Sequence, residues 1–240
     1  MRGRGAGCAA VLLMLLSGCG DGGQKADGPP KRETTAAGAD GHADPGKVFT
    51  DAELKAALLP AKAIGPRAKK PEITLGLFNR QFGSGDWSAC EPGDGTRAEL
   101  AQMRGASAEQ WVRPDPDKIS EGDPYVYERL VSMPAERAGH YLDLRRQLHE
   151  ACPRVTVDTE AAPVDEHHEA RDLPDLGDEA VLETTRTTGG DEYDGTPHYE
   201  AEVRVGGVLV IVGAGTDKDL TIASAAQAVV RVRTELYKAL

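Results

Sequence analysis

The sequence has few cysteines and aromatic residues, a deficit of basic charge and no apolar run long enough for a stable membrane span. Lys and Arg number 28 against 39 Asp and Glu, which gives the 240-residue chain a formal net charge of −11. This acidic balance argues against a nucleic-acid partner and against electrostatic binding to anionic lipid. The apolar segment at residues 9–16 is much shorter than the roughly 20 residues of a spanning helix.

The first residues are typical of an export signal that ends in a lipid attachment site. Arg2 and Arg4 precede the apolar segment, which runs into Leu-Ser-Gly-Cys at residues 16–19. This tetrapeptide resembles the lipobox of bacterial lipoproteins, an aliphatic residue and two small residues before a cysteine. The resemblance implies that residues 1–18 are a cleaved signal peptide and that Cys19 carries acyl chains such as palmitate, two of which anchor a protein stably. An ordinary secretory signal with a chance cysteine is the alternative.

The next segment, residues 19–46, is predicted to be a disordered tether. It consists of Gly, Ala, Asp, Thr and Pro with almost no large apolar side chain. Such a segment cannot bury enough apolar surface to offset its ordering entropy. Residues 47–240 are long enough for a substantial core and are predicted to form one domain.

Residues 198–213 give the strongest structural signal in this domain. Apolar and polar residues alternate from His198 to Val205, as in a strand with one buried face. Gly206 and Gly207 then suit a hairpin turn. Residues 208–212 are an unbroken apolar run, as in a central strand covered on both faces.

Weaker patterns complete the predicted fold. Strands are expected at 125–133, 155–157 and 177–188, and in the first of these the tyrosine face is expected to be buried. Helices are expected after the Thr50–Glu53 capping box, from Pro134 to Pro153, and at 219–238. Residues 92–105 read as a mobile or weakly structured insertion in which a helical turn around 98–103 is an alternative, and 161–175 as an irregular acidic loop. The prediction is therefore an α+β fold, an antiparallel β-sheet of three or four strands with helices packed on one face.

Only two cysteines remain after Cys19. Cys90 and Cys152 form an even pair in an exported chain, so a structural disulfide is predicted between them. It would close a loop of about 60 residues, which is worth on the order of 4 kcal/mol in the chain-entropy model. A redox-active pair is the alternative, but the chain has no Cys-x-x-Cys motif after Cys19.

The sequence contains no set of residues that predicts catalysis, a cofactor or a metal site. Residues 165–169, Asp-Glu-His-His-Glu, have metal-ligand types, but adjacent histidines on a strand would face opposite sides, and a solvated loop is favoured. His140 and His149 are expected on the surface of their helix. Residues 213–218 lack the third glycine of a dinucleotide fingerprint and are predicted to be a strand-to-helix turn. Trp87 and Trp111 could line a cleft, although packing in the core is favoured for each.

The order of elements from residue 48 onward resembles the PknH-like extracellular sensor domain, found on receptor kinases and on free-standing bacterial lipoproteins. The resemblance rests on these features: the helix at 53–59, Trp87 before Cys90, a helix ending in Cys152, Gly-Asp-Glu-Ala at 177–180, the hairpin around 203–208 and a C-terminal helix. It implies an antiparallel sheet with helices and a central cleft for a small ligand. Members of this family commonly carry a second disulfide, which this chain lacks.

Together these features predict an extracytoplasmic lipoprotein, attached to the cell membrane through Cys19, that binds a small ligand or an envelope partner in a cleft without catalysis. Two alternatives remain. One is a structural or protein-interaction lipoprotein that uses an exposed apolar patch. The other is an envelope hydrolase whose histidines and carboxylates converge only in three dimensions.

Overall fold

The computed structural model describes residues 44, 46–69, 72–76, 78, 87, 89–90, 95–115, 117, 125–159, 162–190 and 194–237. The predicted signal peptide, Cys19 and nearly all of the predicted tether lie outside these residues and stay predictions. Among the helices within the described ranges, none has both the length and the apolar character of a membrane span.

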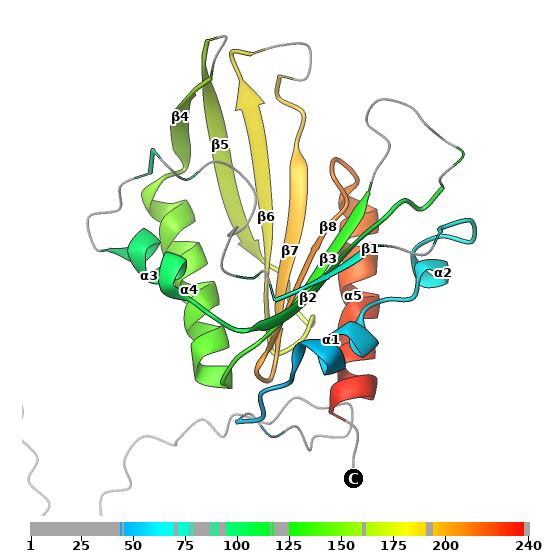
Figure 1. Cartoon of the computed structure of the whole chain (residues 1–240). Coiled ribbons are helices and arrows are strands. Elements are labelled where there is room, and N and C mark those ends of the chain that lie inside the picture. The colour runs from blue at the N-terminus through cyan, green and yellow to red at the C-terminus, as the bar shows by residue number, and fades with distance from the viewer. Residues whose placement is uncertain are drawn as a thin grey trace, which may run out of the picture. The chain divides into compact units, whose positions relative to one another are not determined.

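The described residues form an eight-stranded antiparallel sheet with five helices (Figure 1). The strands lie side by side in the order β1-β2-β3-β8-β7-β6-β5-β4. Their bounds are β1 Glu72–Leu75, β2 Ala106–Val112, β3 Val126–Ser132, β4 Arg154–Asp158, β5 Pro163–Asp172, β6 Glu179–Thr188, β7 His198–Val205 and β8 Val208–Gly213. The helices are α1 Asp51–Ala57, α2 Ala61–Ile64, α3 Thr96–Gln102, α4 Ala135–Ala151 and α5 Lys218–Leu236. The predicted fold class is confirmed.

The β7–β8 hairpin lies at the centre of the sheet, as its pattern predicts. β8 pairs with β7 on one side and β3 on the other, and five of its six residues are buried. The turn needs glycine for two reasons. Gly206 has a φ of +57°, and a Cβ on Gly207 would come within 2.3 Å of the Met133 carbonyl oxygen. The hairpin therefore fixes the register of the strands on both sides.

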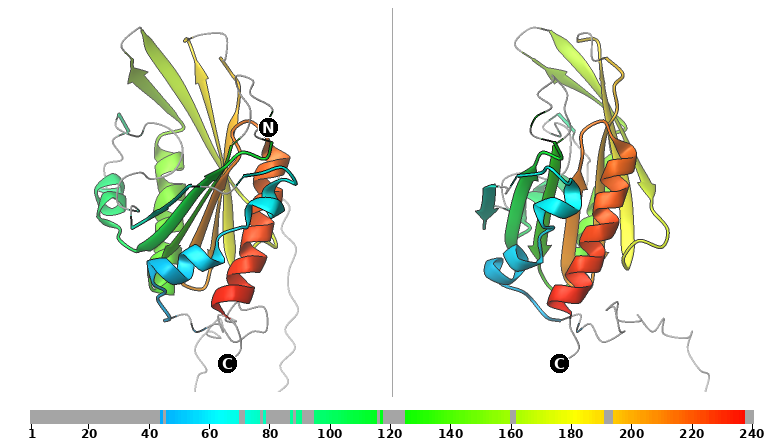
Figure 2. Two further views of the ribbon diagram at one scale, coloured as in Figure 1. Left: turned by 45° about the vertical axis from the view of Figure 1, so that its right-hand side comes forward. Right: turned by 90° about the vertical axis from the view of Figure 1, so that its right-hand side faces the viewer.

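Helices cover both faces of this sheet, whereas the sequence analysis placed them on one. Val208, Val210 and Val212 face a core formed with α1 and α5, while Leu209 and Ile211 face a second core formed with α3 and α4. Figure 2 shows α1 next to α5 on one side of the sheet. An unbroken apolar run at 208–212 is consistent with this arrangement, because each face of the strand needs its own apolar cover.

Several predicted boundaries hold and others are wrong. α4, α5, β4 and β6 lie where their patterns place them, and Thr50 and Glu53 form the predicted capping box of α1. The structure describes eight strands, whereas a sheet of three or four was expected. β1, β2 and β5 were not predicted as strands. Residues 161–175 contain the ten-residue strand β5 instead of a loop. Within 92–105, α3 lies where the alternative of a helical turn around 98–103 was considered, and it begins two residues earlier. On β3 the face of Val126, Glu128 and Leu130 is fully buried, so the tyrosine face is the less buried one.

Candidate functional site

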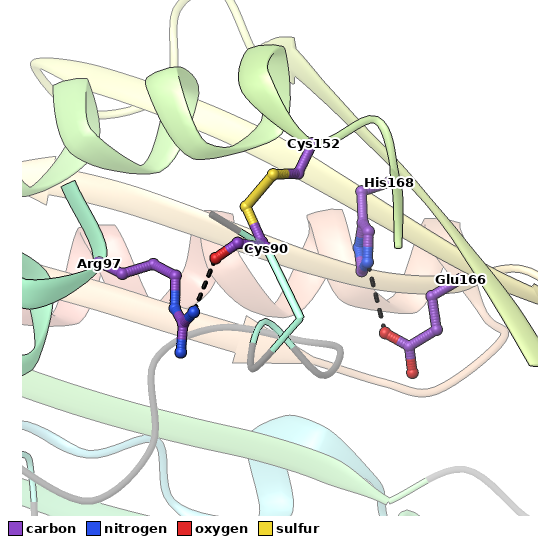
Figure 3. The surroundings of a disulfide bond; sticks show 5 residues. All are labelled: Cys90, Arg97, Cys152, Glu166 and His168. Carbon is purple, nitrogen blue, oxygen red and sulfur yellow. Dashed lines mark hydrogen bonds and ion pairs between the residues drawn. A yellow bond between two sulfur atoms is a disulfide. The ribbon is translucent and has the colours of Figure 1, made fainter. Parts of the chain in front are cut away.

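A disulfide at the end of α4 organises one side of the sheet. Cys90 is bonded to Cys152, which directly follows the last residue of α4, and the bond closes a sequence separation of 62 residues. Figure 3 shows Arg97 of α3 pointing at Cys90, where its Nη1 donates to the backbone carbonyl at 2.7 Å. The bond thus ties the chain around Cys90 to the C-terminal end of α4, as predicted.

The indole of Trp87 packs among cationic and imidazole side chains beside this bond. Trp87 is 8% exposed, and its ring centroid lies 4.0 Å from that of His168 on β5 and 4.9 Å from that of His149 on α4. The guanidinium carbon of Arg145 lies 5.3 Å from the same indole centroid. Contacts of this kind between a cation and an aromatic face are attractive, and more so where water is excluded.

Arg145 forms the centre of a buried ion-pair network. Its Nε donates to Glu183 Oε1 at 2.8 Å, its Nη2 donates to Glu183 Oε2, and its Nε lies 3.7 Å from Glu202 Oε2. The Tyr141 hydroxyl donates to Glu202 Oε1 at 2.8 Å, and His149 Nε2 lies 3.0 Å from Glu183 Oε1. The side chains of Arg145, Glu183 and Glu202 are fully buried.

Burial and the neighbouring charges push the pKa values of the two carboxyls apart. Burial raises the pKa of Glu202 well above its usual value, and the negative charge of Glu183 raises it further. Burial alone would also raise the pKa of Glu183, but the charge of Arg145 and the contact with His149 outweigh it, so that pKa is lowered. The two carboxyls therefore differ in environment: the contacts of Glu183 favour its charged form, whereas burial and the charge of Glu183 favour the neutral form of Glu202.

Local structure brings this network together from distant parts of the sequence. Tyr141, Arg145 and His149 are spaced by four residues, which places them on one face of α4. Glu183 of β6 lies directly opposite Glu200 of β7, and Glu202 is two residues further along. Two like charges at directly opposite positions destabilise a sheet unless a counter-charge separates them. Arg145 supplies that counter-charge.

The carboxyl groups of Glu183, Glu202 and the neighbouring Glu200 also lie close enough to be considered as metal ligands. One oxygen from each of Glu183, Glu200 and Glu202 lies within 4.8 Å of the others. However, Arg145 already donates two hydrogen bonds to Glu183, and Tyr141 holds Glu202. A guanidinium in this position repels a divalent cation, so the arrangement fits an ion-pair network better than a metal site.

An open pocket of about 340 Å³ lies between α4 and strands β5 and β6, and we call it the α4 pocket. It is lined by Arg146, His149, Glu150, His168, Glu169, Ala170, Arg171, Asp172 and Val181. Arg146 is paired with Asp172 and Glu179, and Arg171 with Glu169. The Arg146–Asp172 pair thus presents both charges at the wall, beside the apolar side chains of Ala170 and Val181. The side chains of Glu169 and Arg171 follow the alternation of His167 and point to the other face of β5.

His149 gives this pocket a buried polar atom with hydrogen-bonding capacity left. The side chain is only 4% exposed, and its Nδ1 has no hydrogen-bond partner among the described residues. His168 is buried beside it, with ring centroids 6.0 Å apart, and its Nε2 lies 3.3 Å from Glu166 Oε2 (Figure 3). Buried polar atoms usually have partners, so the unpaired nitrogen is a candidate ligand contact. It has almost no exposed surface, so the imidazole, which lines the pocket, would have to reorient to make that contact.

The sequence analysis separated these two histidines from the site. It expected His149 on the surface and His168 in a solvated loop, and both expectations are wrong. The alternation of β5 does place the two adjacent histidines on opposite faces, because His167 points away and its Nε2 lies 2.9 Å from Thr188 Oγ1. The i, i+4 spacing of Tyr141, Arg145 and His149 was the signal that could have identified the buried polar face of α4.

The remaining candidate side chains are dispersed. His140 is exposed and contacts Glu99 at 2.7 Å, and His198 is exposed on β7. The prediction that each tryptophan packs in the core is confirmed for Trp87, which is 8% exposed, and is wrong for Trp111, which is 53% exposed. The turn after β8 is a strand-to-helix connection, as predicted, in which Asp217 caps α5 by accepting from the Leu220 N–H.

Comparison with known proteins identifies the fold. No protein-family profile matches the chain, and no curated protein sequence matches it. Among solved structures, the extracellular domain of PknH from Mycobacterium tuberculosis is similar, with a TM-score of 0.50 and 17% sequence identity. The match covers 79% of this chain and 98% of that domain. The chain therefore shares the fold that its order of elements resembles.

Proposed function

We propose that this chain is a lipid-anchored extracytoplasmic binding module that holds a small polar ligand in the α4 pocket and performs no chemistry on it. The observation that carries this proposal is the pocket itself. It offers a volume of about 340 Å³, which is within the range of small-molecule sites, next to a buried imidazole nitrogen.

The charges of the wall favour a ligand that carries both signs. Arg146 is paired with Asp172 at the wall, and Ala170 and Val181 provide its apolar part. A zwitterionic or strongly hydrogen-bonding molecule can be matched by such a wall, whereas a simple anion or cation meets charges of its own sign. Paired side chains of this type give specificity more than affinity.

The proposed location rests on the first 19 residues and on the disulfide. A lipobox ending in Cys19 would place the domain outside the cytoplasm on acyl chains, and disulfides persist in such oxidising compartments. The structural similarity to an extracellular domain supports the same location.

Burial of the ion-pair network supports binding rather than catalysis. Glu183 and Glu202 have the strongly shifted pKa values that catalytic carboxyls often show. Their side chains are fully buried, however, and are held by Arg145 and Tyr141. A group that a substrate cannot reach has no part in general acid–base catalysis.

A pocket-filling variant tests the proposal. The polar small-molecule fraction of a cell-envelope extract is added to the purified full chain, and the shift in unfolding temperature is measured, since a ligand at 100 times its Kd stabilises by about 2.7 kcal/mol. Ala170→Phe, which fills the pocket from β5, should abolish the shift. Val164→Phe, further along the same strand and outside the pocket wall, should preserve it. A shift that survives Ala170→Phe would place binding elsewhere.

An exposed aromatic group supports a second candidate function, contact with an envelope protein. Trp111 and Tyr125 are 53% and 41% exposed, and the Trp111 and Tyr127 ring centroids lie 4.6 Å apart. Trp, Tyr and Arg are the residues that dominate protein interfaces, and Arg113 stacks over Tyr125 at 4.5 Å. Trp111→Ala would then weaken co-purification of a cross-linked envelope partner and leave the ligand-dependent shift unchanged.

A further inference from the structure

We propose that reduction of the Cys90–Cys152 disulfide by a dithiol withdraws Trp87 from the histidines of the α4 pocket and thereby changes the affinity of that pocket. The movement of Trp87 is inferred from the geometry around the disulfide. The effect on affinity rests on the proposed function as well.

The disulfide positions Trp87 through a short, direct connection. The Cys90 N–H donates to the Trp87 carbonyl oxygen at 3.1 Å, so the two residues are held in one turn. At the other end of the bond, Cys152 lies three residues after His149 on α4. The covalent link therefore holds the indole in contact with the face of α4 that carries His149.

Trp87 in turn supports the pocket wall from the inside. Its indole contacts His149 and His168, and both histidines line the α4 pocket. Arg145, with no exposed side-chain surface, lies on the same indole. Removal of the indole would therefore free both imidazoles to reorient and would open a path from the pocket toward the Arg145–Glu183 pair.

The fold can tolerate such an opening. A buried ion pair carries a desolvation penalty, and entry of water reduces that penalty. Solvation of Arg145 and Glu183 therefore leaves no buried charge without a partner. The main apolar core on the α5 side of the sheet involves neither Trp87 nor Cys90. The expected change is thus local, confined to the α4 side.

The two sulfur atoms differ in their suitability for thiol–disulfide exchange. Cys152 is half-buried whereas Cys90 is 1% exposed, so we assign the Cys152 sulfur as the one that a thiolate attacks. The Cys90–Cys152 bond breaks as the new mixed disulfide forms, and Cys90 leaves as a thiolate. The positive charge of Arg97, bonded to the Cys90 carbonyl, lies on the side of that leaving group and favours the thiolate form.

The exchange is completed by the second thiol of the reductant. It attacks the mixed disulfide, releases Cys152 and leaves the reductant as its own disulfide. Two electrons and two protons pass from the dithiol to the protein, which then contains two thiols. The reductant required is a dithiol protein or small molecule of the same extracytoplasmic compartment.

Tryptophan fluorescence tests the movement directly, because the chain has only two tryptophans. Trp111→Phe leaves Trp87 as the only emitter, and dithiothreitol serves as the dithiol. On reduction, the Trp87 emission should move to longer wavelength and its quenching by acrylamide should rise severalfold. The same protein carrying Cys90→Ser and Cys152→Ser should show the reduced spectrum without any reductant.

Two outcomes would overturn the movement. One is an unchanged Trp87 emission in protein whose two thiols have been shown to be free by titration. The other is loss of the far-UV circular dichroism signal, which would mean that reduction unfolds the whole domain instead of releasing Trp87.

The effect on affinity is separated from the proposed function by repeating the envelope-fraction assay on oxidised and reduced protein. A ligand-dependent shift that differs between the two states supports redox control. An equal shift in both states refutes the control but leaves the binding function standing. Absence of any shift in both states refutes the binding function, while the fluorescence result still decides the movement of Trp87.

Discussion

Replacement of Arg145 with methionine tests the buried ion-pair network, because it removes the cation and leaves the Glu183 carboxylate behind. Both side chains have no exposed surface. Breaking a buried pair by removing one partner typically costs about 3–5 kcal/mol. Arg145 lowers the pKa of Glu183, whereas burial raises that of Glu202, so Glu183 is the carboxyl that depends most on the counter-charge, and we expect a loss in this range.

A double variant separates the charge from the packing. Arg145→Met with Glu183→Leu removes both charges of the pair, and apolar replacements of buried ion pairs are often neutral or stabilising by about 1–4 kcal/mol. The double variant should therefore recover most of the stability that the single variant loses. Tyr141 and Glu202 keep their hydrogen bond to each other in both variants, so the two variants differ only at residue 183.

The single variant should also acquire a characteristic pH dependence. Without Arg145, burial raises the pKa of Glu183 above that of an unfolded glutamate. A carboxyl with a raised folded pKa favours the folded state at low pH and disfavours it as the pH rises, so the penalty should shrink toward pH 5. Urea unfolding at pH 5 and pH 7 measures this. A single-variant penalty below about 1 kcal/mol at pH 7, where typical surface substitutions fall, would refute the reasoning.

Three further changes test other parts of the structure. Burial raises the pKa of Glu128 to about 7, so ionisation of this carboxyl should lower the free energy of unfolding by up to about 3 kcal/mol as the pH rises from 4.5 through 7. Glu128→Gln should therefore flatten the pH dependence of that free energy over this range. Parallel pH profiles of the wild type and the variant would contradict this. Cys90→Ala with Cys152→Ala should lower the free energy of urea unfolding by about 4 kcal/mol, given the separation of 62 residues, and a loss under about 1 kcal/mol would argue against a constrained unfolded state. Cys19→Ala should move the protein from the membrane fraction to the soluble fraction with an unchanged unfolding curve, and continued membrane association would exclude the acyl anchor.

The parts of the fold that the sequence predicted are those in which local pattern and tertiary structure agree. The β7–β8 hairpin combines alternation, a Gly206–Gly207 turn and an apolar run, and α4 has a proline at its start and an apolar side. The disulfide followed from counting cysteines in an exported chain. In each case a few adjacent residues carry the information.

The parts that were missed depend on contacts across long sequence separations. β5 has an acidic, histidine-containing sequence because much of it is only partly buried, so its pattern resembles that of a loop. Arg145 and His149 are polar residues on the buried side of α4, and their partner Glu183 is more than thirty residues away. A pattern that assigns polar residues to solvent cannot recognise a buried ion pair before its partners are brought together.

The measurement that tests the central claim most directly is the nuclear magnetic resonance of the histidine side chains during ligand titration. The chain has six histidines, and His149 and His168 line the α4 pocket while His140 and His198 are exposed elsewhere. On addition of the polar small-molecule fraction of the envelope, the imidazole signals of His149 and His168 should shift and those of His140 and His198 should stay constant. Constant signals from His149 and His168 under conditions where the unfolding temperature rises would contradict the assignment of the α4 pocket as the binding site.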